Sequence, residues 1–148
     1  MIMKSYELNS VEETLSFGQD LAKQLPEGSI LCFEGDLASG KTTMIKGIVS
    51  GMMDYPQDQV NSPTFVYLNI YEGDRIVYHF DLYRLEDPDE FLAMGFDELL
   101  DEGGVTCCIE WPERMAPYLP KPYIKVKLEH LGENRRLVTV LECGHEKI

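Results

Sequence analysis

Apolar residues follow two different patterns along this chain. Consecutive apolar runs at 30–33 and 105–109 are bounded by turn and polar residues, which is typical of short strands buried on both faces of a sheet. Apolar residues three and four positions apart recur instead over 11–25 and 45–52. This spacing predicts two amphipathic helices, each with one buried face.

Both predicted helices have end signals. Ser10, followed three residues later by Glu13, matches a capping box at the start of the first helix. Gly51 can end the second helix. The positions at helical spacing that we expect to be buried are Val11, Leu15, Ala22 and Leu25 in the first helix and Ile45, Ile48, Val49 and Met52 in the second.

Strand-like and helix-like segments alternate through the rest of the chain. Segments 65–71 and 76–81 flank a short turn and predict a hairpin. The acidic group at 87–90 predicts the start of one or two short helices. Segments 123–129 and 136–142 alternate like an exposed C-terminal hairpin.

The segment between the first apolar run and the second helix matches a phosphate-binding pattern. Gly35 to Thr42 read G-x-x-x-x-G-K-[ST], and the pattern lies between strand and helix, as its chemistry requires. Glycines let the backbone N–H groups turn toward phosphate oxygens, and the helix adds its positive N-terminal end. Lys41 would then reach the β- and γ-phosphates, and the Thr42 hydroxyl would bind Mg²⁺.

This order of elements predicts the fold class. Strands and helices that interleave around a phosphate loop indicate a three-layer α/β fold of the P-loop NTPase type, with a mixed sheet, antiparallel edge strands and a C-terminal hairpin. The 148 residues are most simply one domain, residues 1–148.

Charge narrows the set of partners. The chain has 26 acidic and 13 basic residues, a formal net charge of −13, which opposes nonspecific attraction to nucleic acid or anionic lipid. We expect an acidic surface suited to solubility or to a basic protein partner. No apolar stretch approaches the length of a membrane span, and no signal peptide precedes the first helix, so we expect a cytoplasmic protein.

The cysteines do not form a recognisable metal or redox motif. Cys32, Cys107 and Cys108 lie inside apolar runs and are expected to be buried, reduced thiols. Cys143 and His145 could contribute to a metal site only with ligands from elsewhere.

Two acidic residues end apolar strands and are candidates for Mg²⁺ binding. Asp81 closes 76–80 and Glu110 closes 105–109, and an acidic residue at the carboxyl end of a strand beside a phosphate loop commonly holds Mg²⁺. The residues alone leave open which of the two serves. We expect His79 to be a hydrogen-bonded strand residue rather than a general base.

Several motifs together resemble those of one family. They are Gly35-Asp36-Leu37, Gly40-Lys41-Thr42-Thr43, Ser62-Pro63-Thr64, His79-Phe80-Asp81-Leu82-Tyr83-Arg84-Leu85 and Ile109-Glu110-Trp111-Pro112. In this order and spacing they resemble the TsaE family, formerly YjeE, over essentially the whole chain. Its members are small bacterial P-loop ATPases that support threonylcarbamoyladenosine modification of tRNA.

The resemblance implies a role for each matching residue. The nucleotide contacts it implies are Ser10, Asp36, Leu37, Ala38, Ser39, Gly40, Lys41, Thr42, Thr43 and Arg136. It also implies Thr42 and Glu110 as Mg²⁺ ligands, and the catalytic residues it implies are Lys41, Asp81, Glu110 and Thr64. Arg135 competes with Arg136 for the nucleotide contact, because one sequence does not fix the register of the hairpin.

Other residues near these motifs have two interpretations. Thr64 and Asp81 resemble the mobile and sensing parts of the site, with Asp81 binding Mg²⁺ through water or orienting the attacking water. Trp111 packs beside the site or is an ordinary core or rim aromatic. Arg84 contacts a partner or a phosphate, or belongs to a salt bridge.

The phosphate loop departs from the family pattern at one position. Family members commonly have Gly-Ala where this chain has Ala38-Ser39. If that glycine takes a positive φ, Ala38 is strained by roughly 1 kcal/mol. We expect weaker or altered nucleotide binding rather than its loss, because Gly35 and Gly40 remain.

The resemblance implies an accessory protein with ATP and Mg²⁺ as cofactors. It would hydrolyse ATP slowly, because no arginine is obviously placed as a cis finger. It would be a monomer alone, would act through a complex with TsaB and TsaD, and would meet tRNA only through that complex. A small-molecule or nucleotide kinase is the alternative enzyme, although the five arginines do not cluster in a lid. A binding module that does not hydrolyse ATP is the non-enzymatic alternative.

Overall fold

One mixed β-sheet organises the fold. The computed structural model describes residues 3–36, 39–62 and 66–144, and within these the sheet has seven strands in the order β1-β7-β6-β2-β5-β4-β3. The strands are β1 Met3–Leu8, β2 Ile30–Glu34, β3 Leu68–Glu72, β4 Ile76–Asp81, β5 Thr106–Glu110, β6 Tyr123–Gly132 and β7 Arg135–Cys143. The helices are α1 Val11–Gln24, α2 Lys41–Met52, α3 Pro88–Ala93, α4 Phe96–Leu100, and the 3₁₀ segments η1 Gln57–Gln59 and η2 Pro112–Tyr118.

The centre of the sheet is parallel and its edges are antiparallel. Strand β2 pairs in parallel with β5 and β6, and β4 pairs in parallel with β5. The pairs β3–β4, β6–β7 and β1–β7 are antiparallel. This arrangement confirms the predicted α/β fold class, with a mixed sheet and antiparallel edge strands.

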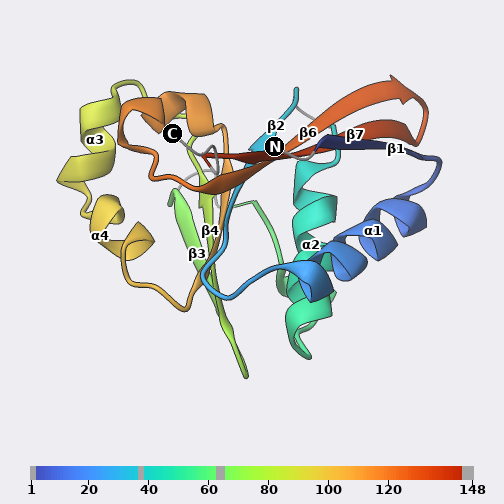
Figure 1. The fold of residues 1–148 in the computed structure, drawn as a ribbon, viewed down its shortest axis with the longest axis horizontal. Helices are drawn as coiled ribbons and strands as arrows, with labels where there is room; N and C mark the ends of the chain where they lie inside the picture. The colour runs from blue at the N-terminus through green and yellow to red at the C-terminus, as the bar shows by residue number, and fades with distance from the viewer. Residues whose placement is uncertain (1–2, 37–38, 63–65, 145–148) are drawn as a thin grey trace.

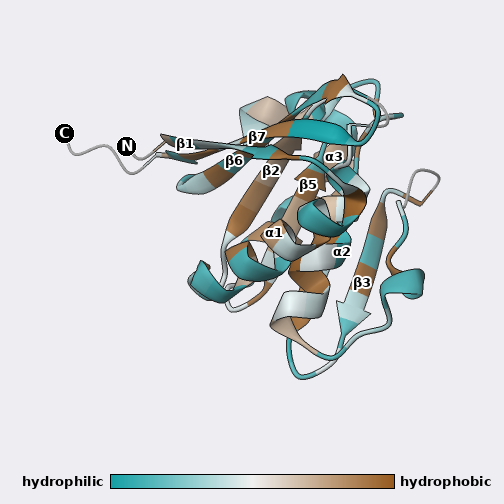
Figure 2. Ribbon diagram, turned by 90° about the vertical axis from the view of Figure 1, so that its right-hand side faces the viewer, coloured by the Kyte–Doolittle hydropathy of each residue, from teal (hydrophilic) through white to brown (hydrophobic). Residues whose placement is uncertain are grey.

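Helices cover both faces of the sheet (Figure 1). Helices α1 and α2 lie on one side, and α3, α4 and η2 lie on the other. Side chains of β2 alternate between the two layers, because successive residues of a strand point to opposite faces. Leu31 and Phe33 pack in the core beneath α1 and α2, and Ile30 and Cys32 pack in the other core. Burial on both faces explains the unbroken apolar run of this strand, visible as the hydrophobic β2 and β5 in Figure 2.

The backbones of α1 and α2 approach each other closely through glycine. A Cβ atom added at Gly47 would lie 2.3 Å from the carbonyl oxygen of Leu15, and one added at Gly18 would lie 2.5 Å from that of Met44. No larger side chain fits at either position without moving a helix. This contact holds α2, and with it the phosphate loop at its start, against the rest of the α1 layer.

The predicted faces of these helices need two corrections. Val11 is 46% exposed, and the fully buried positions of α1 are Thr14, Gly18 and Ala22. Small residues are buried there because the helix axes are close. Gly51 lies within α2 rather than ending it.

The C-terminal hairpin forms as predicted, with most of its residues exposed or half-buried, but its position in the sheet was not predicted. Strand β6 pairs with the central β2, and β7 is covered by β1, which the pattern did not predict. The β3–β4 hairpin and the two short helices after Asp87 form as predicted. Ser10 caps α1 by accepting a hydrogen bond from the backbone N–H of Glu13 at 3.1 Å.

The cysteines in the apolar strands are buried free thiols, as predicted. Cys32, Cys107 and Cys108 are at most 1% exposed, and burial raises the pKa of each thiol, to about 12 for Cys107. Cys143 is also a free thiol, whereas His145 lies outside the described residues. Among the helices that the structure describes, none is long and apolar enough to cross a membrane.

Replacing Gly47 with alanine tests the contact between α1 and α2. We expect the free energy of unfolding to fall by about 1–3 kcal/mol, because the added methyl group must push the helices apart. The higher helix propensity of alanine, taken alone, would instead raise the free energy of unfolding by about 1 kcal/mol. Urea denaturation followed by circular dichroism measures the change. Ser16→Ala, on the exposed face of α1, is the control and should stay within about 0.5 kcal/mol; unchanged stability of Gly47→Ala would contradict the close packing.

Candidate functional site

Two glycines shape the loop between β2 and α2. A Cβ atom at Gly35 would lie 2.5 Å from the Leu128 carbonyl oxygen and 2.6 Å from Ser39 Oγ, so no side chain fits there. Gly40 takes a φ of 103°, in the left-handed region that glycine adopts without strain. Gly40 is also the N-cap of α2 and provides no side-chain cap. The first turn of α2 therefore begins at the loop without a capping carboxylate or hydroxyl.

Lys41 is buried at this turn. Its side-chain Nζ donates a hydrogen bond to the Gly35 carbonyl oxygen at 2.7 Å and lies 3.8 Å from the ring centroid of Trp111. Burial lowers the pKa of Lys41, and the nearby carboxylates of Glu110 and Asp81 oppose that shift. The ammonium group thus lies inside the loop, where it is partly desolvated and held by a carbonyl and an aromatic face.

Trp111 lies beside the phosphate loop because of a turn at the end of β5. It has a φ of 61°, an uncommon conformation for a bulky residue. Its ring contacts Tyr83, with the ring centroids 4.9 Å apart, as well as the Lys41 ammonium. Of the two interpretations, the structure favours packing beside the site.

Both candidate carboxylates lie at the same edge of the sheet as the loop. Asp81 at the end of β4 is directly opposite Glu110 at the end of β5, and they are 4% and 3% exposed. Thr42 Oγ1 donates to Glu110 Oε2 at 3.4 Å. Asp81 accepts hydrogen bonds from the Ser62 hydroxyl and, at 3.1 Å, from the backbone N–H of Tyr83.

Glu110 has a second buried partner, His79. The distance from His79 Nε2 to Glu110 Oε2 is 2.6 Å, and His79 Nδ1 lies 2.8 Å from the hydroxyl of Tyr71. His79 is therefore a hydrogen-bonded strand residue, as predicted. Its connection to the candidate Mg²⁺ ligand was not predicted, because His79 and Glu110 are 31 residues apart in the sequence.

The two neighbouring arginines of β7 point to different places. Arg136 Nε donates to the Ser39 carbonyl oxygen at 2.7 Å, so its guanidinium contacts the phosphate loop. Arg135 instead forms an ion pair with Glu7 of β1. The geometry favours Arg136 of the two alternatives.

These residues surround one cavity of about 460 Å³. The described residues that line it are Ser39, Gly40, Lys41, Thr42, Thr43, Ser62, Asp81, Tyr83, Arg84, Glu110, Trp111 and Arg136. Ser39 Oγ is buried without a hydrogen-bond partner among the described residues, an unusual state for a buried hydroxyl. Arg84 is also one of the lining residues and adds positive charge to the wall of the cavity.

Some predicted site residues are elsewhere or are not described. Ser10 caps α1, and neither Ser10 nor Asp36 is among the described residues that line the cavity. Leu37, Ala38 and Thr64 lie outside the described residues. Their predicted roles, and the effect of Ala38, stay predictions.

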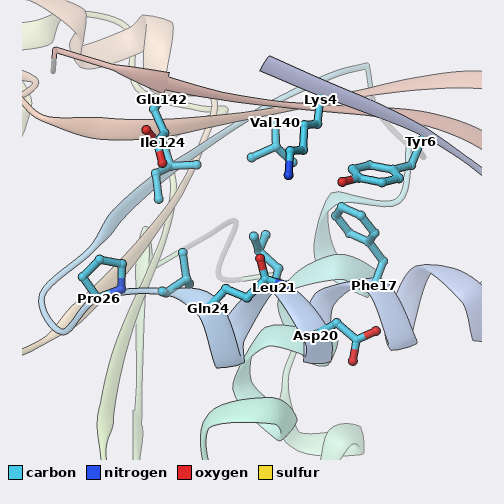
Figure 3. Close-up of a pocket in the computed structure, with 11 residues that line it drawn as sticks. Lys4, Tyr6, Phe17, Asp20, Leu21, Gln24, Pro26, Ile124, Val140 and Glu142 are labelled. Atoms are coloured by element: carbon cyan, nitrogen blue, oxygen red, sulfur yellow. The ribbon is translucent and has the colours of Figure 1, made fainter. Parts of the chain in front are cut away.

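A second cavity, of about 310 Å³, lies between α1 and the strands β1, β6 and β7 (Figure 3). Apolar side chains form much of its wall, and the rings of Tyr6 and Phe17 lie against each other at one end. Lys4 points into this space, whereas Asp20 points away from it. It shares none of its described lining residues with the cavity at the phosphate loop.

The cavity at the phosphate loop fits a magnesium nucleotide. Lys41 and Arg136 supply positive charge, and Ser39 Oγ is a buried hydroxyl in need of a partner. No group of three His, Cys, Asp or Glu side chains able to hold a metal occurs in the described part of the chain. Mg²⁺ is usually bound by one or two carboxylates together with phosphate oxygens and water, so Thr42 and Glu110 are a suitable pair.

Comparison with known proteins identifies the family. The family described as "Threonylcarbamoyl adenosine biosynthesis protein TsaE" matches residues 8–138. A tRNA threonylcarbamoyladenosine biosynthesis protein TsaE from Treponema pallidum is 37% identical over 131 residues, which cover 88% of this chain and 95% of that protein. The protein of the same name from a Nostoc species is 43% identical over 140 residues, covering 89% and 83%.

A solved structure has the same fold. The crystal structure of YdiB from Bacillus subtilis superposes with a TM-score of 0.75 at 26% sequence identity, covering 97% of this chain and 86% of that one. The overall fold is thus P-loop NTPase-like along nearly the whole length. From the family match and these similarities together, we conclude that the chain belongs to the TsaE family.

Proposed function

We propose that this protein binds Mg·ATP at Lys41 and hydrolyses it slowly, as an accessory protein in threonylcarbamoyl modification of tRNA adenosine. The observation that carries the proposal is the convergence of Lys41, Thr42, Asp81 and Glu110 on one cavity next to the loop between β2 and α2. Membership of a family of threonylcarbamoyl adenosine biosynthesis proteins supports the pathway.

Each of these side chains has a function that its position supports. Lys41 would give up its hydrogen bond to the Gly35 carbonyl and donate to the β- and γ-phosphates instead. Thr42 and Glu110 would hold Mg²⁺, which supplies neutralisation of the charge that develops on the phosphate oxygens. Asp81 would orient the attacking water or reach Mg²⁺ through a water molecule. Arg136 would contact the nucleotide, and Ser62 would respond to it through its hydrogen bond with Asp81.

We propose that the partners are the TsaB and TsaD proteins and that tRNA is met only through their complex. The formal net charge of −13 supports this, because it opposes direct attraction to the tRNA phosphate backbone. ATP binding and hydrolysis would then change the conformation at Ser62, and so regulate attachment to the partners.

Substitution of the two charged residues separates binding from turnover. Lys41→Ala is expected to weaken ATP binding about 10- to 100-fold, because a charge-assisted hydrogen bond contributes about 1.5–3 kcal/mol. Glu110→Gln should retain ATP binding without Mg²⁺ and lose Mg²⁺-dependent turnover. Calorimetric titration of ATP and a phosphate-release assay measure these effects. Lys46→Ala in α2 and Glu129→Gln in β6 are the matched controls; wild-type affinity of Lys41→Ala would contradict the proposed site.

The dependence on partners is tested by turnover alone and in the assembled complex. We expect slow phosphate release from the isolated protein and faster release when TsaB and TsaD are added together. Rapid turnover that is equal in both conditions would contradict partner stimulation. Stoichiometric transfer of phosphate to a small acceptor would instead support the kinase alternative, and absence of release even in the complex would support a binding module.

A further inference from the structure

A line of buried polar groups leads away from the cavity into the core on the α2 side of the sheet. In the parallel pairing of β4 with β5, His79 lies opposite Cys108, two residues before Glu110. Residues two apart on a strand share a face, so His79 and Glu110 point to the same side. His79 is 0% exposed and Tyr71, on the neighbouring β3, is 2% exposed.

The hydrogen bond between His79 and Glu110 fixes one carboxylate oxygen. An ionised carboxylate only accepts hydrogen bonds, so His79 Nε2 carries the proton that lies on the 2.6 Å contact with Glu110 Oε2. Thr42 Oγ1 donates to the same oxygen. Two donors, one from β4 and one from α2, thus hold this carboxylate oxygen near the start of α2. Water does not readily replace such a bond at full burial, so losing it is costly.

The other end of this line reaches the backbone before Ser62. The hydroxyl of Tyr71 lies 2.8 Å from His79 Nδ1 and 3.1 Å from the Asn61 carbonyl oxygen. Its single proton can be donated to one of these acceptors at a time. Asn69 Nδ2 also donates to the Asn61 carbonyl oxygen, at 3.0 Å.

Both carboxylates of the cavity are therefore connected to the same short segment. Ser62 donates directly to Asp81. Asn61, the preceding residue, competes with His79, the partner of Glu110, for the single proton of the Tyr71 hydroxyl, so the hydrogen bonds at Asn61 and at His79 depend on each other. A movement of this segment would change the hydrogen bonding of both carboxylates together.

We propose that His79 is a positioning residue that holds Glu110 toward Thr42, and that Tyr71 couples this carboxylate to the backbone at Asn61. This inference rests on the proposed function, because it takes Glu110 as the Mg²⁺ ligand. Removing the partner that orients a metal ligand typically costs about 10- to 100-fold in metal affinity. A histidine that only fills the core would change stability and leave the Mg²⁺ dependence of ATP binding unaltered.

The single tryptophan of the chain provides a direct measurement. Trp111 contacts Lys41 within the cavity, so its fluorescence reports binding there without any turnover. Titrating Mg²⁺ at fixed ATP gives the half-saturating concentration for each variant. His79→Leu, which removes both nitrogens, should raise it about 10- to 100-fold. The side-chain amide of His79→Gln can replace the Nε2 donor. The half-saturating Mg²⁺ concentration of this variant should therefore lie within about 3-fold of that of the unmodified protein.

Tyr71→Phe tests the connection to Asn61. It removes the hydroxyl and keeps the ring, and we expect a rise in half-saturation of about 3- to 10-fold, weaker than loss of the direct partner. The effect should vanish in the His79→Gln background, which has lost the Nδ1 contact, because mutations in one network are not additive. If the effects of Tyr71→Phe and His79→Gln on half-saturation are additive, the coupling is overturned. This test does not depend on His79→Leu, so it holds even if that variant fails to fold.

Controls separate this inference from the proposed function. His130→Gln replaces an exposed histidine of β6 and should leave the titration unchanged. If the unmodified protein with ATP shows no Mg²⁺-dependent change in Trp111 fluorescence, the proposed function is contradicted. The positioning role alone would be overturned by three results together. The unmodified protein gives a normal Mg²⁺ titration, Glu110→Gln abolishes it, and folded His79→Leu gives the same half-saturation as the unmodified protein. Circular dichroism establishes that each variant is folded.

Discussion

Parallel pairing of β2, β5 and β4 is the constraint on which the whole site depends. Parallel strands bring their carboxyl ends to one edge of the sheet, so the residues that follow or end them meet there. The phosphate loop follows β2, Glu110 ends β5, and Asp81 ends β4 in register with Glu110. Thr42 and Glu110, which are 68 residues apart in the sequence, thereby face a single cavity. The antiparallel edges extend the sheet, and β7 adds Arg136 beside the loop.

This edge of the sheet concentrates buried charge, and that charge is stable only because it is paired. Burying an ammonium or a carboxylate without partners is strongly unfavourable. Lys41 is held by the Gly35 carbonyl and the Trp111 ring, and Glu110 by His79 and Thr42. Each partner comes from a different element, so the arrangement exists only in the folded chain. A nucleotide phosphate would enter a site that is already organised to receive charge.

Sequence reasoning predicted the strand, loop and helix around Lys41 well, because a local pattern determines each of them. It was less successful where packing between distant elements decides the outcome. Val11 was expected inside and is exposed, because α1 meets α2 through Gly18 and its small neighbours rather than through its larger apolar residues. The pairing of the C-terminal hairpin with the central β2 was not predicted, because alternation in β6 does not reveal which strand lies beside it.

The sequence by itself determined the phosphate-loop pattern, the α/β class and the family, since these follow from residue types at fixed short spacings. Tertiary structure alone decided that Arg136 rather than Arg135 contacts the loop, and that His79 binds Glu110 while Tyr71 reaches Asn61. Strand register and the direction of each side chain set these contacts. Both depend on the packing of the whole sheet, which no local stretch of residues encodes.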